Sequence, residues 1–328
     1  MAIVAVAGGT GDLGSLIVEA LLTTGKHEVY ILSRKSPDAS STVVSPTSQS
    51  PYQPIIQTNY ESDDVLARQL SARKIDTIIC AVSLDFDEPS EAQLLLIRAA
   101  VKAKCVKRFI PSEFNVDYDL GDDVLPYSGK KYHVIARREL EKTNLEFTYI
   151  YTGFFMDYLG MPYYETKMRQ LYILLDAAHR VASIPGDGLA RIALTCTKDV
   201  ARYIAAALDV PSWPRVLTVA ASHISTNELV ALAEKCTGEK LKVEQYSIED
   251  LRSHKADVLP SNENIASHFP EGMDQLRALL GDLSASIALA SYDFSKVADA
   301  VDLVKYFQDD LEPPLGVEEF IAKTWTRR

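Results

Sequence analysis

The sequence has few cysteines, no long apolar run and no basic segment before its first apolar run. Its four cysteines, Cys80, Cys105, Cys196 and Cys236, lie far apart and form no C-x-x-C pair, which argues against zinc-binding and redox motifs. No stretch approaches the 18 apolar residues of a membrane span, so we expect no membrane association. No basic segment or cleavage-site pattern precedes the first apolar run, so we expect a cytoplasmic protein.

Basic residues are also in the minority. The 328-residue chain has 34 Lys and Arg against 45 Asp and Glu, which gives a formal net charge of −11. This balance disfavours nonspecific nucleic-acid binding, because phosphate contacts need a basic surface. The acidic stretch with Asp117, Asp119, Asp122 and Asp123 lacks the spacing of a calcium loop, so we expect a solvated loop and no metal. A chain this long usually has more than one domain, and we expect a monomer or a homodimer.

The most informative segment is residues 3–14, IVAVAGGTGDLG. An apolar run is followed by glycines in a G-x-x-G-x-x-G pattern and then by an amphipathic run, an order typical of strand, tight turn and helix. Such a turn lets the backbone approach a pyrophosphate, which the free N–H groups of the new helix attract. The alternative is a tight turn without a ligand. The predicted cofactor-binding residues here are Gly8, Gly9, Thr10, Gly11, Asp12, Leu13 and Gly14.

The second predicted strand, residues 28–33, ends in the basic pair Arg34 and Lys35. NAD sites usually place an acidic residue near this point, whereas NADP sites offer cations to the 2′-phosphate. Because arginine can bind phosphate with two hydrogen bonds, Arg34 is the first candidate. The pair therefore predicts NADPH rather than NADH as the cofactor, unless it is a solvated pair at the end of a strand.

Strand and helix patterns alternate over the first 150 residues, which predicts a parallel sheet with helices on both faces. We expect an α/β fold: a Rossmann-like, doubly wound parallel sheet with a smaller C-terminal α/β substrate region. The expected strands are 2–7, 28–33, 54–58, 76–82, 107–111 and 146–151, and the expected helices are 12–24, 62–72, 91–104 and 128–143. Residues 36–53, rich in Ser, Thr and Pro, are expected to form a mobile loop near the adenosine end of the cofactor.

The pattern becomes irregular after residue 152, which suggests a second region. A strand–helix unit is expected at 191–209, a strand at 215–220, and helices at 226–237, 270–281 and 315–326. We assign residues 1–155, with 191–222 returning to them, to an NADP-binding Rossmann domain. We assign 156–190 and 223–328 to a substrate-binding region, and expect the substrate in the cleft beside the strand ends.

Several motifs together resemble one family, and they extend over nearly the whole chain. They are Gly8–Gly14, the run Lys107–Phe114 (KRFIPSEF), Arg137–Glu141 (RRELE), Phe147–Ile150, Pro185–Gly188, Thr197–Val200 and Ser225–Leu229. The chain resembles the isoflavone reductase-like, NmrA-like branch of the atypical short-chain dehydrogenases. That branch includes phenylcoumaran benzylic ether reductases, pinoresinol–lariciresinol reductases and fungal members.

The resemblance implies an NADPH-dependent oxidoreductase that reduces a C=O, C=C, C=N or benzylic C–O bond in a small, often aromatic secondary metabolite. The cofactor supplies the hydride, and the protein supplies orientation and a proton. NmrA-like proteins also include NADP(H) sensors that regulate partners without turnover, and this second function remains open at this point.

The sequence departs from the family at the predicted catalytic helix. Family reductases have a lysine four residues before the pair Arg137-Arg138, and this chain has His133 there. One hypothesis uses His133, helped by Lys130 one helical turn earlier, to position the ribose or to donate a proton. A second uses Tyr127 and Lys131, which have the Y-x-x-x-K spacing of short-chain dehydrogenases. The third is a solvated helix face without chemistry.

Residues at the ends of the predicted strands complete the expected cofactor site: Ala81, Val82, Ser83, Pro111, Ser112, Phe114, Gly153 and Phe155. The resemblance implies that those of the KRFIPSEF run and those near Phe155 flank the nicotinamide. Ser112 is a candidate hydrogen-bond donor to substrate or a turn residue. A cluster of large side chains either forms an aromatic substrate pocket or belongs to the core: Phe154, Phe155, Tyr158, Met161, Tyr163 and Tyr164.

Overall fold

The computed structural model describes residues 1–37, 42–84 and 86–325, and its chain divides into two compact units. Unit 1 comprises residues 1–114, 129–150 and 200–217, and unit 2 comprises 115–128, 151–199 and 218–328. Segment 115–128, which follows the KRFIPSEF run, thus groups with unit 2. The assignment of one region to the cofactor and another to the substrate remains a prediction.

Unit 1 contains a six-stranded sheet in which every neighbouring pair is parallel, in the order β5-β2-β1-β6-β7-β8. The strands are β1 (Ile3–Ala7), β2 (Glu28–Ser33), β5 (Ile55–Gln57), β6 (Thr77–Cys80), β7 (Arg108–Ile110) and β8 (Glu146–Phe147). Val4–Ala7 are fully buried, as expected for a central strand covered on both faces. The strand order reverses at β1, which confirms the doubly wound α/β fold.

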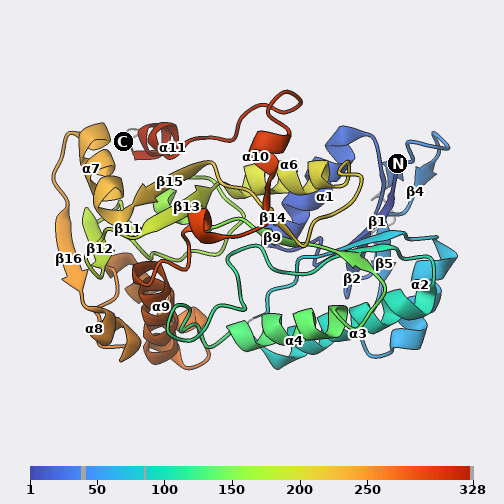
Figure 1. Cartoon of the computed structure of the whole chain (residues 1–328), viewed down its shortest axis with the longest axis horizontal. Helices are drawn as coiled ribbons and strands as arrows, with labels where there is room; N and C mark the ends of the chain where they lie inside the picture. Colours follow the sequence, from blue (N-terminus) through green and yellow to red (C-terminus); the bar gives the residue numbers. More distant parts are fainter. Residues whose placement is uncertain (38–41, 85, 326–328) are drawn as a thin grey trace. The chain divides into compact units, whose positions relative to one another are not determined.

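The helices of this unit lie on both sides of the sheet. They are α1 (Asp12–Thr24), α2 (Asp63–Ala72), α3 (Asp87–Ala103) and α4 (Lys130–Leu140), and α6 (Thr197–Ala207) leads the chain back into unit 1. Figure 1 shows α2, α3 and α4 side by side on one side of the strands and α1 on the other. In α1 the buried residues Leu13, Leu16, Ile17 and Leu21 follow the helical period.

The predicted strand 146–151 is wrong as a single element. β8 ends at Phe147, and β9 (Tyr149–Tyr151) lies beside β14 (Val216–Thr218) instead of in the large sheet. The backbone N–H of Tyr149 donates to the carbonyl of Arg215 at 3.0 Å. The chain therefore changes hydrogen-bonding partners at Thr148, and a continuous apolar run does not reveal such a change.

The expected loop at 36–53 also needs correction. Within it, β3 (Val43–Val44) and β4 (Pro51–Tyr52) pair in an antiparallel fashion, while residues 38–41 lie outside the described residues. The hydroxyl of Tyr52 donates to the carbonyl of Val29 at 2.9 Å and accepts from its N–H at 2.8 Å. This segment is thus attached to β2 through backbone contacts that its Ser- and Pro-rich composition does not predict.

Unit 2 is built from small sheets and short helices. One sheet has the order β10-β13-β15 and another β11-β12-β16, and each mixes parallel and antiparallel pairs. Its strands are β10 (Phe154–Phe155), β11 (Leu175–Asp176), β12 (Val181–Pro185), β13 (Arg191–Thr195), β15 (Ser222–Ser225), β16 (Lys242–Tyr246) and β17 (Val301–Asp302). Of these, only β13 begins where the sequence predicts a strand.

The helices of unit 2 follow the sequence more closely. They are α5 (Asp157–Gly160), α7 (Thr226–Thr237), α8 (Ile248–Arg252), α9 (Gly272–Ala288), α10 (Leu303–Tyr306) and α11 (Val317–Trp325), with 3₁₀ turns η1 (Pro260–Asn264), η2 (Ala266–His268) and η3 (Phe294–Lys296). Helix α7 has the predicted bounds, whereas α9 extends seven residues beyond the predicted end at 281. The end predicted for α11, residue 326, is outside the described residues. No helix among the described residues is long and apolar enough to cross a membrane.

Candidate functional site

The glycine turn between β1 and α1 leaves no room for side chains at two positions. Gly8 has a φ of +76°, and a Cβ there would lie 2.5 Å from the carbonyl oxygen of Ala81. A Cβ on Gly14 would lie 2.1 Å from the carbonyl oxygen of Gly8. Any other residue would push the first turn of α1 away from the end of β1, so the glycines bring helix and strand into close contact.

The N-terminus of α1 is suited to an anion. Its N-cap residue is Gly11, which offers no side-chain acceptor to the first N–H groups of the helix. Uncapped N–H groups and the helix dipole together attract phosphate. Around this end Thr10 and Gly11 are exposed, Asp12 is half-buried and Leu13 packs inside, while Gly9 lies against Ile31 and Val18. The cradle thus fits the pyrophosphate of a dinucleotide.

Arg34 lies at the same end of the sheet as this turn. The register pairs Ala7 of β1 with Leu32 of β2, and Arg34 follows two residues later. The Arg34 guanidinium forms an ion pair with Glu88, with Nη1 2.5 Å from Oε1. Lys35 is exposed, and its backbone N–H donates to the hydroxyl of Ser33. Both cations therefore lie at this end of the sheet, with Arg34 paired to Glu88.

Ser112, just after β7, is fixed by three hydrogen bonds. Its N–H donates to Oε1 of Gln93 at 2.8 Å, and its hydroxyl donates to the carbonyl of Val82 at 2.7 Å. Its carbonyl accepts from Nδ1 of His133 at 2.9 Å. These contacts connect the ends of β6 and β7 with α3 and α4. The Ser112 hydroxyl already donates its proton to the Val82 carbonyl. This geometry therefore does not support its expected role as a hydrogen-bond donor to substrate.

The contact with the Ser112 carbonyl fixes the state of His133. A carbonyl only accepts, so Nδ1 carries the proton and the neutral ring has none on Nε2. His133 is buried, and this burial lowers the pKa of the imidazole to about 3, while the bond to Ser112 opposes the shift and nearby Arg137 adds to it. The ring is therefore neutral at physiological pH. This favours the positioning role of His133 over proton donation by an imidazolium.

An ion pair lies next to this serine. The guanidinium of Arg137 from α4 contacts both carboxylate oxygens of Glu113, with Nη2 2.6 Å from Oε2, and both side chains are at most 1% exposed. The Arg137 guanidinium also stacks on the ring of Tyr149, 4.3 Å from its centroid. The Glu and Arg of the sequence motifs thus join α4 to the end of β7.

Tyr127 and Lys131 do not lie on adjacent turns of one helix. The predicted helix 128–143 begins only at Lys130, after Gly129 as N-cap, so Tyr127 precedes it and belongs to unit 2. The helical spacing that suggested a Tyr–Lys pair is therefore absent. Lys131 is exposed, with its ammonium 4.7 Å from the centroid of the Tyr132 ring, and Lys130 is half-buried in the first turn.

The other residues predicted at the strand ends of unit 1 differ in how far they are buried. The N–H of Ala81 donates to the carbonyl of Ala7 at 2.8 Å, next to the glycine turn. Val82 is half-buried and Ser83 is exposed. Pro111 is buried and Phe114 is half-buried. The structure thus gathers the residues that follow β1, β2, β6 and β7 at one edge of the sheet.

Gly153 and Phe155 belong to unit 2. A Cβ on Gly153, whose φ is +68°, would lie 2.2 Å from the carbonyl oxygen of Ala193, so this glycine lets the chain pass close to β13. Phe155 is half-buried and stacks on Tyr158 with an interplanar angle of 26°. Of the remaining aromatic cluster, Phe154 and Met161 are core residues, Tyr164 packs on Phe320, and Tyr163 is exposed.

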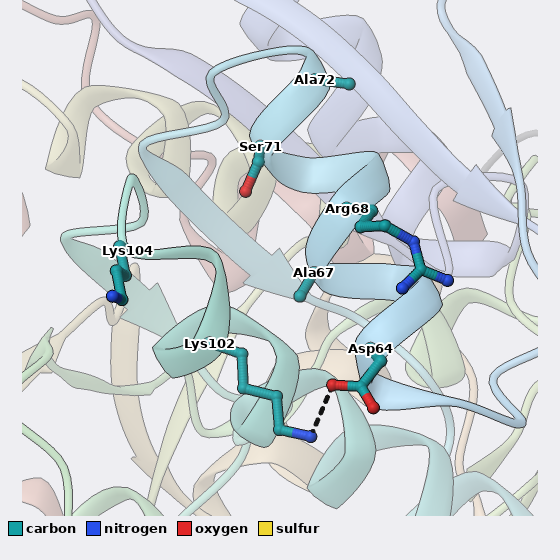
Figure 2. Close-up of a pocket in the computed structure, with 7 residues that line it drawn as sticks. All are labelled: Asp64, Ala67, Arg68, Ser71, Ala72, Lys102 and Lys104. Atoms are coloured by element: carbon teal, nitrogen blue, oxygen red, sulfur yellow. Dashed lines mark hydrogen bonds and ion pairs between the residues drawn. The ribbon is translucent and has the colours of Figure 1, made fainter.

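A depression on unit 1 lies outside the predicted site. Figure 2 shows a depression on unit 1 between α2 and α3, lined by Asp64, Ala67, Arg68, Ser71, Ala72, Lys102 and Lys104. Lys102 is paired there with Asp64 at 2.8 Å, and none of the predicted site residues is among the seven. Within the described ranges, no group of three His, Cys, Asp or Glu side chains could hold a metal ion, the acidic stretch 117–123 included.

A sequence model of the NmrA-like family matches residues 2–289. The chain belongs to this family. The oxidoreductase BOA1 of Botryotinia fuckeliana is 34% identical over 275 residues, covering 82% of this chain and 88% of that protein. The isoflavone reductase homolog P3 of Arabidopsis thaliana is 31% identical over 268 residues, covering 78% and 82% of the two chains. The resemblance noted in the sequence is therefore confirmed.

Solved structures of reductases share the fold of this NmrA-like chain. The binary complex of leucoanthocyanidin reductase with NADPH from Vitis vinifera has a TM-score of 0.73 at 20% identity and covers 99% of both chains. AtPrR2 with NADP+ and (+)pinoresinol has a TM-score of 0.72 at 22% identity and covers 98% of both. At such low identity these neighbours establish the fold alone.

Sequence reasoning missed Gln93 and Glu88 as site residues in this NmrA-like chain. Gln93 is a buried polar residue in the run QLLLI of α3, and a lone amide on an apolar helix face was the available signal. Glu88 lies in the exposed, acidic first turn of α3, and acidic residues commonly stabilise this end of a helix through its dipole. Its sequence position therefore gave no sign of another role. Glu88 and Arg34 are 54 positions apart in the sequence, which does not reveal that they pair.

Proposed function

We propose that this protein is an NADPH-dependent reductase of a small aromatic secondary metabolite. Its curated relatives carry the names of oxidoreductases and an isoflavone reductase homolog. Two of its structural neighbours were solved with NADPH or NADP+. The residues present fit that cofactor: the cradle at Gly8 and Gly14 suits a pyrophosphate, and Arg34 suits a 2′-phosphate.

The observation that carries the proposal is the uncapped N-terminus of α1, which the close contact at Gly14 holds against the end of β1. A tight βα turn without a ligand needs no uncapped helix end and no cation beside it, whereas this turn has both. Nicotinamide cofactors supply the hydride. In this chain Ser112 and His133 position the backbone at the ends of β6 and β7. The isoflavone reductase homolog among its relatives supports an aromatic substrate.

Replacement of Gly14 tests the cradle. Gly14→Ala places a methyl group on the Gly8 carbonyl, so NADPH affinity should fall at least about tenfold, which corresponds to about 1.4 kcal/mol. The control is Gly25→Ala at the other end of α1, where φ is +62° but a Cβ would meet nothing within 4 Å, so this variant changes the backbone preference without filling the turn. Calorimetric titration with NADPH should show a normal affinity for the control. Equal affinity in both variants would contradict a pyrophosphate site at this turn.

A second candidate is an NADP(H)-sensing protein without turnover. His133 favours it, because this neutral side chain stands where family reductases have a lysine. Consumption of NADPH with a panel of phenolic ketones and benzylic ethers separates the two. The reductase proposal expects turnover with at least one of them, reduced by His133→Ala. NADPH binding without turnover, unchanged by His133→Ala, favours the sensor.

A further inference from the structure

The ion pair between Arg34 and Glu88 crosses the glycine turn of unit 1. Arg34 follows β2, and Glu88 lies in the first turn of α3, which follows β6. Because β2 and β6 are the two neighbours of β1 in the sheet, a contact between these residues passes over the end of β1. The pair therefore lies at the edge of the sheet that carries the glycine turn, the proposed cofactor site.

The two side chains are exposed, 71% for Arg34 and 81% for Glu88, with 2.5 Å between Nη1 and Oε1. An exposed pair of this kind contributes little to stability, because solvent screens both charges. The ion pair nevertheless holds the Arg34 guanidinium against the Glu88 carboxylate. A phosphate group has more negative charge and more acceptor oxygens than a carboxylate, and it binds arginine with charge-assisted hydrogen bonds.

We propose that Glu88 is a specificity-determining residue that competes with the 2′-phosphate of NADPH for Arg34. This inference rests on the proposed NADPH site. In the structure the Glu88 carboxylate is bound to the Arg34 guanidinium. NADPH binding therefore requires the 2′-phosphate to replace this carboxylate on Arg34. NADH has a hydroxyl at that position and requires no exchange. Glu88 thus lowers the preference for NADPH below what Arg34 alone would give.

The neighbouring acids of α3 do not share this role. Asp87 accepts a hydrogen bond from the hydroxyl of Tyr132 at 2.8 Å and so connects α3 with α4. Glu91, one turn further along the same helix, is exposed and provides a matched control. Glu91→Gln removes the same charge from the same helix without changing the Arg34 contact.

Calorimetric titrations with NADPH and NADH test the proposal in five proteins: wild type, Glu88→Gln, Glu91→Gln, Arg34→Ala and the Arg34→Ala/Glu88→Gln double variant. We expect Glu88→Gln to bind NADPH about two- to fivefold more tightly, the range for release of an exposed ion pair, and NADH as in wild type. Glu91→Gln should match wild type. In the Arg34→Ala background the gain should disappear, since no guanidinium remains to be released.

Three results would overturn the inference while leaving the NADPH site intact. They are unchanged NADPH affinity in Glu88→Gln, an equal gain with and without Arg34, and a loss of NADH affinity in Glu88→Gln. The last would make Glu88 a ligand of the ribose hydroxyls. Absence of NADPH binding by the wild-type protein would instead remove the proposed function, and the inference with it.

Discussion

Ser112 illustrates how single residues build the candidate site. Its N–H, hydroxyl and carbonyl are all used within unit 1, by Gln93, Val82 and His133. A serine after proline in the sequence suggested either a turn residue or a donor to substrate, and its partners favour the first. The residue matters because it fixes the backbone next to the cofactor edge of the sheet.

Gln93→Leu should destabilise the protein by about 1–3 kcal/mol, because it leaves the buried N–H of Ser112 without an acceptor. Urea unfolding of the variant and the wild type measures this difference. A leucine at this site also removes the buried Nε2 of Gln93, which has no hydrogen-bond partner among the described residues, so the measured loss is the net of the two changes. A loss below about 0.5 kcal/mol would mean that the Ser112 backbone does not depend on Gln93.

His133 should make stability depend on pH. The unfolded imidazole takes up a proton below about pH 6.5, whereas the folded one does so only near pH 3. The contribution of the neutral His133 ring to the free energy of unfolding is therefore complete above about pH 6.5. It falls by up to about 4–5 kcal/mol as the pH drops toward 3. His133→Asn, which can still donate to the Ser112 carbonyl, should lose less stability between about pH 7 and pH 4.5. Urea unfolding at both pH values checks this, and an identical loss in the two proteins would contradict it.

At the scale of elements, α4 depends on the Glu113–Arg137 pair. Both charges are buried, so removing one takes away the ion pair that compensates the other. Arg137→Met should lower the free energy of unfolding by about 3–5 kcal/mol, and the Glu113→Leu/Arg137→Met double variant should lose less than the sum of the single variants. Denaturant titrations of the three variants measure this. Additive losses would show that the two side chains act independently.

Elements with local signals could be predicted from the sequence. Helix α1 begins and ends where expected because Gly25, in a left-handed conformation, marks its end. Helix α7 has a capping box between Ser225 and Glu228. Helix α4 starts two residues late, since Gly129 at its N-cap has no side chain that signals a start. The division of 146–151 into two strands depends on a distant partner, the carbonyl of Arg215.

At the scale of the whole molecule, the alternation of strands and helices was enough to predict the parallel sheet of unit 1. The small sheets of unit 2 were missed because they depend on distant pairings, such as β12 with β16, which joins residues 181–185 to 242–246. The glycine turn was predictable because strand, glycines and helix are contiguous. The contacts of Gln93 and Glu88 were not, because they arise only after α3 packs beside the sheet.

The NADPH site is the central claim, and titration of the purified protein with NADPH and NADH tests it most directly. We expect NADPH to bind more tightly than NADH, and Arg34→Ala to remove most of that preference, because NADH lacks the phosphate that Arg34 recognises. Equal affinities for the two cofactors, unchanged by Arg34→Ala, would contradict this role of Arg34. No binding of either would contradict the reductase proposal as a whole.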